Sequence, residues 1–150
     1  MDLRTHLPYR LARLSLYISR ATTERYVQDT EISAREWRAL GMLGIKGAMT
    51  PTDLCALTGM GPATITRAAS HLEKLGLIRR IRNKHDNRSQ VLQLTATGTA
   101  RCAEITPKTA KSGELCAGLY TAGEFALLIE LLDRLDQAIA GGLLDRDGEG

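Results

Sequence analysis

Cysteine and long apolar runs are both scarce in this chain of 150 residues, and each shortage excludes a class of protein. The three cysteines, Cys55, Cys102 and Cys116, are too few and odd in number for a disulfide framework, and none belongs to a C-x-x-C pair that would indicate zinc or thioredoxin-like chemistry. Residues 1–20 carry arginines throughout, so they predict neither a signal peptide nor a membrane span. We therefore expect a cytoplasmic protein without membrane contact.

Catalytic signatures are lacking as well. The sequence contains no Gly-rich phosphate loop, no H-E-x-x-H and no G-x-S-x-G motif, and its histidines, His6, His71 and His85, fall in three different predicted elements. We expect no enzyme activity, no catalytic residue, no metal site and no cofactor. The hydrophobic fraction of 43% and the charged fraction of 25% are those of an ordinary folded domain.

The charge is unevenly distributed. Between residues 50 and 95 seven Lys/Arg stand against three acids, whereas residues 120–150 hold two arginines and seven acids. A basic middle beside an acidic end indicates a module that binds a polyanion, joined to a region that does not touch it.

Helix signals punctuate the first half of the chain. A helical apolar stripe predicts a helix from Pro8 to about Asp29. Ser33 and Glu36 form a capping box for a second helix that ends at Gly47. Two short helices follow, each with proline at its first position, over residues 51–58 and 62–75. This pair, joined by "TGMG", predicts a helix-turn-helix.

The pattern then alternates and becomes helical again. "LIRRIR" (77–82) and "VLQLT" (91–95) predict two strands around a turn rich in Asn, Asp and Ser. A helix with a kink at Pro107 is expected from Thr95 to about Gly118, and a capping box of Thr121 and Glu124 begins a last amphipathic helix. The apolar stripe of that helix needs a partner to cover it.

A charged turn at the tip of a hairpin beside a helix-turn-helix predicts a winged helix, whose wing reaches phosphates and the minor groove. The spacing D-x-R-x-x-x-x-x-L-T, formed by Asp86, Arg88, Leu94 and Thr95, resembles the wing signature of the MarR family of bacterial transcription regulators. The segments "GPATITRAASHLEKLGLIRR" and "SAREWRALGML" extend the resemblance, and the order of elements agrees from about Leu7 to Ala140.

The resemblance implies a mainly α fold with a small β-hairpin wing, in which a winged helix-turn-helix lobe is joined to a helical dimerisation region. It implies that residues 1–150 form one MarR-like domain, with dimerisation helices at about 7–30 and 96–140 and a winged helix-turn-helix DNA-binding lobe at about 33–95. It further implies a homodimer that binds a pseudo-palindromic double-stranded operator and regulates transcription, most simply as a repressor.

Eight residues are expected to contact DNA. The second helix of the helix-turn-helix would read bases in the major groove, while the turn would contact phosphates and a narrow minor groove, with Asp86 orienting Arg88. The alternative for the helix residues is an ordinary solvated face, and for Asp86 and Arg88 an ion pair that only stabilises the turn. The predicted DNA-binding residues are Thr64, Thr66, Arg67, Ser70, Lys84, Asp86, Asn87 and Arg88.

A small-molecule effector is also expected, because relatives hold one between the dimer helices and the lobe. Arginine and aromatic side chains near that cleft would suit an aromatic or otherwise apolar anion that releases DNA. The alternative is that the tryptophan belongs to the core and the arginines are solvated. The candidate ligand-binding residues are Arg13, Tyr17, Arg20, Trp37 and Arg38.

Two other functions stay open at this point. Some MarR-like proteins sense oxidants through a cysteine in the first helix, but this first helix has none, so a redox sensor would have to use Cys55, Cys102 or Cys116. A winged helix can also serve as a protein-interaction module without binding DNA. The basic helix and turn favour DNA over that alternative.

Overall fold

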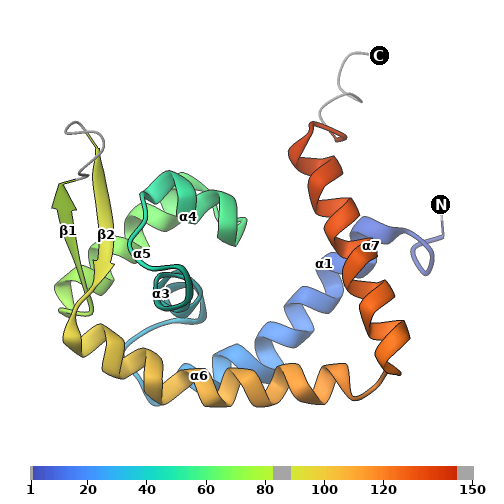
Figure 1. Ribbon diagram of the computed structural model, residues 1–150, viewed down its shortest axis with the longest axis horizontal. Helices are drawn as coiled ribbons and strands as arrows, with labels where there is room; N and C mark the ends of the chain where they lie inside the picture. The colour runs from blue at the N-terminus through green and yellow to red at the C-terminus, as the bar shows by residue number, and fades with distance from the viewer. Residues whose placement is uncertain (1, 83–88, 145–150) are drawn as a thin grey trace. The chain divides into compact units, whose positions relative to one another are not determined.

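The computed structural model describes residues 2–82 and 89–144 (Figure 1). The chain divides into two compact units, Met1–Ala110 and Lys111–Gly150. Four of the predicted DNA contacts, Lys84, Asp86, Asn87 and Arg88, lie outside the described residues.

The first unit begins with a helical segment that changes its winding. It consists of α1 (Leu7–Ile18), the π-helical turn η1 (Ser19–Thr23) and α2 (Glu24–Val27), which confirms the predicted first helix. The His6 side chain accepts a hydrogen bond from the Tyr9 N–H at the start of α1. In η1 the Thr22 hydroxyl donates to the Ile18 carbonyl at 2.5 Å. Such π-helical turns occur often at functional sites.

Three helices of the lobe follow, and their ends are fixed by the predicted signals. They are α3 (Ala34–Lys46), α4 (Pro51–Thr58) and α5 (Pro62–Lys74). Ser33 and Glu36 form the capping box of α3, and Thr50 and Asp53 form a second one at α4. Gly59 ends α4 in the left-handed conformation, with φ of 68°, which glycine adopts without steric cost. The helix-turn-helix prediction is confirmed.

The predicted hairpin is also present. Strands β1 (Ile78–Arg82) and β2 (Gln90–Leu94) pair antiparallel, with Ile78 opposite Leu94 and Arg82 opposite Gln90 (Figure 1). Met49, in the loop between α3 and α4, exchanges two backbone hydrogen bonds with Leu92 at 2.8 and 3.1 Å. This bridge attaches the hairpin to the helices, so its base is held as part of the lobe.

The core of the first unit is centred on the lobe. Apolar side chains from α3, α4, α5, β1 and β2 meet there with side chains from the first half of α6 (Ala96–Ala117). Its most deeply buried large side chains are Leu40, Leu54, Ile65, Leu72, Leu92 and Ile105. This burial of apolar surface is the main force that stabilises the lobe.

The passage from β2 into α6 is close-packed. The Thr95 N–H donates to the Leu77 carbonyl at 3.0 Å, and its hydroxyl donates to the Gly76 carbonyl at 2.6 Å. The same hydroxyl accepts from the Gly98 N–H at 3.1 Å. A Cβ atom on Gly98 would lie 1.9 Å from the Leu77 carbonyl oxygen, a distance that only glycine avoids. The junction thus sets how α6 leaves the lobe.

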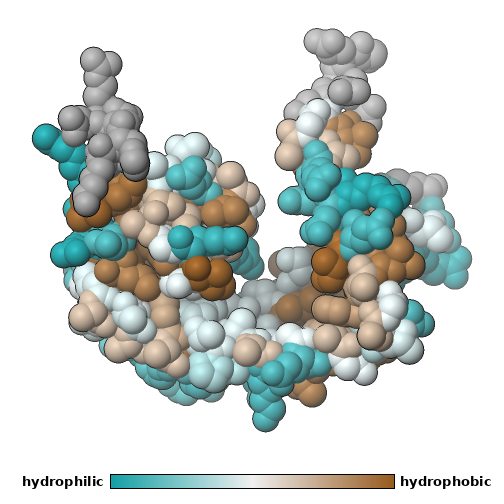
Figure 2. Space-filling model, in the orientation of Figure 1, coloured by the Kyte–Doolittle hydropathy of each residue, from teal (hydrophilic) through white to brown (hydrophobic). Residues whose placement is uncertain are grey.

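The two long C-terminal helices differ from the lobe in burial. Helix α6 runs through Pro107, and its buried residues, Gly98, Cys102 and Ile105, all lie before that proline. Helix α7 (Ala122–Ala140) starts with the predicted Thr121–Glu124 capping box. No residue of α7, all of which is described, is buried, and Figure 2 shows apolar surface over this helix. The assignment of residues 7–30 and 96–140 to dimerisation stays a prediction.

Candidate nucleic-acid interface

Helix α5 presents a polar face opposite its buried one. Ile65, Ala69 and Leu72 point into the core, as the apolar spacing predicts. The other side carries the predicted base-reading residues: Thr66, Arg67 and Ser70 are exposed, whereas Thr64 is half-buried. Side chains that hydrogen-bond and carry positive charge are therefore available along the helix.

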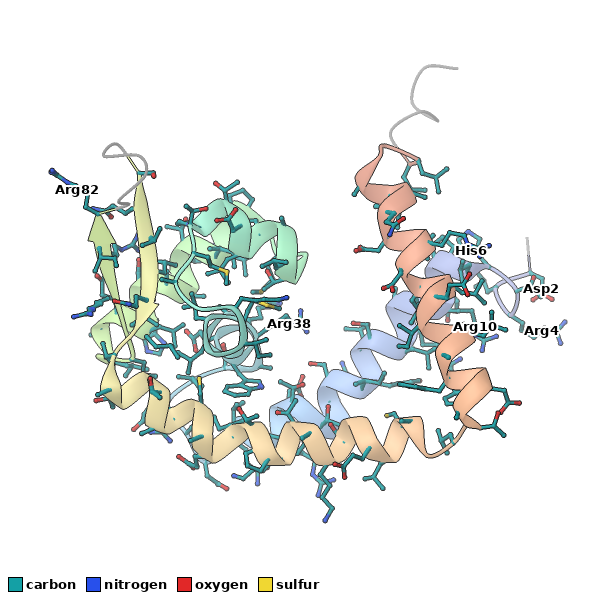
Figure 3. The ribbon with its side chains drawn as sticks, in the orientation of Figure 1. Asp2, Arg4, His6, Arg10, Arg38 and Arg82 are labelled. Atoms are coloured by element: carbon teal, nitrogen blue, oxygen red, sulfur yellow. The ribbon has the colours of Figure 1, made fainter. Side chains whose placement is uncertain are left out.

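The hairpin beside α5 is rich in arginine, and its arginines differ in whether their side chains have hydrogen-bond or ion-pair partners. Arg79 donates two hydrogen bonds to Gln93, at 2.8 and 3.1 Å, and Arg80 pairs with Glu73 at 3.0 Å. Arg82 is exposed, has no partner among the described residues, and points away from the end of β1 (Figure 3). Its position beside the turn could have identified it in the sequence, yet it was absent from the predicted contacts. We add it as a candidate phosphate contact.

A small cavity of about 150 Å³ lies between the start of α3 and α5. It is lined by Ser33, Arg35, Glu36, Thr64, Arg67 and Ala68. Two predicted DNA contacts, Thr64 and Arg67, therefore adjoin the first turn of α3. Arg35 is exposed there and is a second cation that the sequence did not single out.

Glu36 connects these two helices. One of its oxygens accepts from the Ser33 N–H at 2.6 Å, and the other lies 2.6 Å from Nδ1 of His71 on α5. Burial would raise the pKa of Glu36, but hydrogen bonds from Ser33 and His71 outweigh it and lower the pKa. Residues 36 and 71 are too far apart in sequence for this pair to be predicted from local patterns.

Three of the five candidate ligand residues come together on the first helical segment. Arg13, Tyr17 and Arg20 line a cavity of about 310 Å³ with Tyr9, Ala12 and Leu16. The Arg13 guanidinium lies 5.1 Å from the centre of the Tyr17 ring, a cation–π contact. Interaction with Arg13, chiefly as a hydrogen-bond partner, lowers the pKa of Tyr17. A cation beside aromatic surface is a suitable setting for an aromatic anion.

The other two candidates lie elsewhere. Arg38 extends from α3 on the side away from the hairpin (Figure 3). It lines a second cavity of about 490 Å³, which includes Arg35, Ser19 and Leu16; Leu16 also lines the first cavity. Trp37 is buried, and a Cβ on Gly41 would lie 3.5 Å from its ring, so the indole packs in the lobe core.

The cysteines differ in environment, and none is in a disulfide. Cys102 is buried, and its thiol donates to the Leu40 carbonyl at 3.6 Å. Burial raises the pKa of the Cys102 thiol, which disfavours the reactive thiolate. Cys55 is half-buried and Cys116 is exposed.

The described part of the chain has neither a metal-binding cluster nor a single helix that could span a membrane. Within residues 2–82 and 89–144, no group of three or more His, Cys, Asp or Glu side chains could hold a metal ion. No single helix among them is long and apolar enough to cross a membrane, and α6 and α7 meet that test only when joined across the break between them.

Known proteins resemble the chain in both sequence and fold. A sequence model described as "MarR family" matches residues 30–89, which hold the lobe. The multiple antibiotic resistance protein MarR of Salmonella typhimurium is 29% identical over 112 residues, covering 73% of this chain and 77% of that protein. The HTH-type transcriptional regulator YpoP of Bacillus subtilis, itself described as uncharacterized, is 26% identical over 91% of this chain and 99% of its own length.

Solved structures of several transcription regulators share the fold of this chain. A MarR family transcriptional regulator from Silicibacter pomeroyi superimposes with a TM-score of 0.81 at 26% identity, over 95% of this chain and 93% of its own. Bordetella bronchiseptica BpsR, whose DNA binding is regulated by 6-hydroxynicotinic acid, shares the fold with a TM-score of 0.76 at 20% identity, over 90% and 96% of the two chains. The same holds for MepR of S. aureus, solved with DNA, with a TM-score of 0.76 at 16% identity over 87% and 96%.

The structure thus contains a capped helix-turn-helix, a paired hairpin and an exposed polar face on α5. Relatives in both sequence and fold include regulators of one family. In the sequence of its lobe and in its fold, this chain is similar to the MarR family of winged-helix, DNA-binding transcription regulators.

Proposed function

We propose that the protein is a cytoplasmic homodimeric repressor that binds a pseudo-palindromic operator and is released from it by an aromatic or otherwise apolar anion. The observation that carries the DNA-binding part is the exposed set of Thr66, Arg67 and Ser70 on α5. Beside it, β1 ends at Arg82, whose side chain has no partner among the described residues. The helix would occupy the major groove and the wing would contact the backbone and minor groove. MepR, a structural neighbour, has been solved with DNA.

The exposed apolar surface of the long helices supports a homodimer. Helix α7 exposes Leu127, Leu131 and Leu132, which are 53%, 47% and 40% accessible. Helix α1 exposes Leu14 and other apolar side chains, and residues 7–23 hold arginines but no acid, whereas α7 holds four acids and one arginine. A second copy would cover apolar surface with complementary charge, as symmetric dimers do.

The DNA-binding proposal is tested by footprinting together with gel filtration. We expect a dimer that protects two half-sites about 10 bp apart. Arg67→Ala should cost about 1 to 3 kcal/mol of specific binding and relax the preference at particular bases. Arg88→Ala, a wing position assigned by sequence resemblance, should weaken binding to all duplexes. A monomer on a single half-site, or no duplex binding at all, would instead favour a protein-interaction module.

The effector part rests on the two cavities that share Leu16. Arg13, Tyr17 and Arg20 supply cationic and aromatic surface in one, and Arg38 supplies a cation in the other. The π-helical turn η1 contributes Ser19 to one cavity and Arg20 to the other. Two neighbours of this fold are associated with hydroxylated aromatic acids: 6-hydroxynicotinic acid regulates DNA binding by BpsR, and NadR has been solved in complex with 4-hydroxyphenylacetate. A hydroxylated aromatic carboxylate is therefore the first ligand class to test.

Calorimetric titration with benzoate, 4-hydroxyphenylacetate and 6-hydroxynicotinate, followed by operator release, tests this assignment. An effector shifts DNA affinity only by its differential affinity for two states, typically about 5- to 150-fold. Arg13→Ala and Arg38→Ala should weaken the ligand and leave operator binding in its absence nearly unchanged. If peroxide alone released DNA, and Cys102→Ser or Cys116→Ser abolished that release, redox control would replace ligand control.

A further inference from the structure

The contact between His71 and Glu36 is not used by DNA binding, dimerisation or effector binding as proposed above. His71 lies in the last turn of α5, and its Nδ1 atom is 2.6 Å from Oε1 of Glu36. The other carboxylate oxygen, Oε2, accepts from the Ser33 N–H at 2.6 Å. Both oxygens of Glu36 are thus engaged, and its side chain is only 14% accessible. One carboxylate fixes the start of α3 and holds α5 against it.

Arg67 lies one helical turn before His71, so the two side chains project from the same side of α5. Arg67 and Glu36 line the same cavity of about 150 Å³. An arginine and a carboxylate placed this way ordinarily pair, because guanidinium and carboxylate groups match in charge and geometry. Yet Arg67 has no partner among the residues that the structure describes, whereas Arg80 and Arg101 are paired. His71 occupies the position on Glu36 that Arg67 could take.

We propose that His71 is a positioning residue for DNA recognition, which occupies the Glu36 carboxylate and thereby leaves Arg67 free to contact DNA. This inference rests on the proposed role of α5 in reading DNA. When His71 is removed, Oε1 of Glu36 loses its hydrogen-bond donor in a partly buried site. The nearby guanidinium then supplies the missing donors and turns from the DNA toward α3. Specific contacts suffer more than general attraction to phosphate, because the net charge of the helix surface changes little.

Substitutions at position 71 separate positioning from direct contact. His71→Ala removes the donor, whereas His71→Asn keeps an amide nitrogen close to the place of Nδ1. Lys74→Ala is the matched control, because it removes a charged side chain from the same turn of α5 without involving Glu36. Binding is measured to the duplex that the wild-type protein selects from a randomised pool, and to a scrambled duplex of equal composition.

A second substitution tests the part assigned to Glu36. Glu36→Gln keeps a side chain that serves in a capping box but carries no charge to attract Arg67. It is introduced into the His71→Ala protein. Thermal unfolding of every variant is recorded, so that loss of binding is compared at temperatures where all are folded.

We expect His71→Ala to weaken binding to the selected duplex about 5- to 20-fold, within the range for loss of one base contact, and to weaken scrambled duplex much less. His71→Asn and the Glu36→Gln/His71→Ala double variant should recover most of the affinity, with an unchanged salt slope. The inference is overturned if His71→Ala binds normally, or if neither second variant recovers, which would indicate direct contact by His71. If the wild type binds no duplex, the proposed function itself fails.

Discussion

The lobe and the long helices satisfy their apolar residues in different ways. In the lobe, Leu40, Leu72 and Leu92 are fully buried within one chain. In α1 and α7, both completely described, no residue is buried, and even apolar side chains such as Leu14 and Leu127 are about half accessible. The lobe therefore holds a core of its own, whereas these helices require another surface. Variants that act on only one of the two regions test this division.

The largest effect is expected at the junction of the hairpin with α6. Gly98→Ala places a methyl group 1.9 Å from the Leu77 carbonyl oxygen, so β1 or α6 must move. We expect a loss of more than about 3 kcal/mol in the free energy of unfolding, measured by urea denaturation.

Gly113→Ala is the control in the same helix. A Cβ there meets nothing within 4 Å, and alanine favours a helix over glycine by about 1 kcal/mol. This variant should be as stable as the wild type or slightly more stable. Equal losses at both positions would show that the close approach to Leu77 does not determine the stability of the lobe.

A smaller effect is expected from charges placed on α7. Leu127→Glu with Leu131→Glu changes two side chains that are four residues apart and therefore on one side of the helix. If a second copy covers this side, dimer dissociation should become easier by roughly 2 to 3 kcal/mol, as for other buried interface residues. Analytical ultracentrifugation gives the dissociation constant of the dimer directly.

Gln137→Glu adds a charge at another exposed position of α7 and should leave the dimer intact. Circular dichroism should show that the lobe of the double variant is still folded, because the core of the lobe contains no residue of α7. An unchanged dimer in the double variant would mean that this side of α7 is not the interface.

The smallest effect is expected on the pH dependence of stability, through the Glu36 carboxylate. The pKa of Glu36 is lowered on folding, so its carboxylate stabilises the fold fully above the ordinary value of 4.5, and that contribution is lost as pH falls through the lower folded pKa. Glu36→Gln should therefore cost about 1 kcal/mol at neutral pH, and the difference from wild type should vanish below that range. Glu114→Gln, at an exposed site, is the control. A difference that persists in acid would exclude the carboxylate as its cause.

Local signals in the sequence were sufficient for most of the fold. Ser33 with Glu36, Thr50 with Pro51, and Gly59 each act within a few residues of where they lie, so the ends of α3 and α4 could be predicted. The turn η1 could not be, because threonine and serine in a helix carry no distinctive signal for π-helical winding. Its detection requires the hydrogen bonds themselves.

The candidate site was predictable to a lesser extent. The 3.6-residue period separates Arg67 from the buried Ile65, so the exposed face of α5 follows from the sequence. The pairing of Glu36 with His71 depends on how α3 and α5 pack, and no local pattern reports that. Trp37 illustrates the same limit, since it was a candidate for ligand binding and lies in the lobe core.

The burial of Trp37 has a spectroscopic consequence. As the sole tryptophan, with 7% of its surface accessible and its ring packed over Gly41, it makes intrinsic fluorescence a reporter of the lobe interior. Far-ultraviolet circular dichroism, in contrast, is dominated by all the helices, including α1 and α7. Recording both signals along one denaturation curve therefore measures whether the two regions unfold together. Coincident curves would mean that the lobe does not outlast the long helices, and separated curves would give the stability of each region in turn.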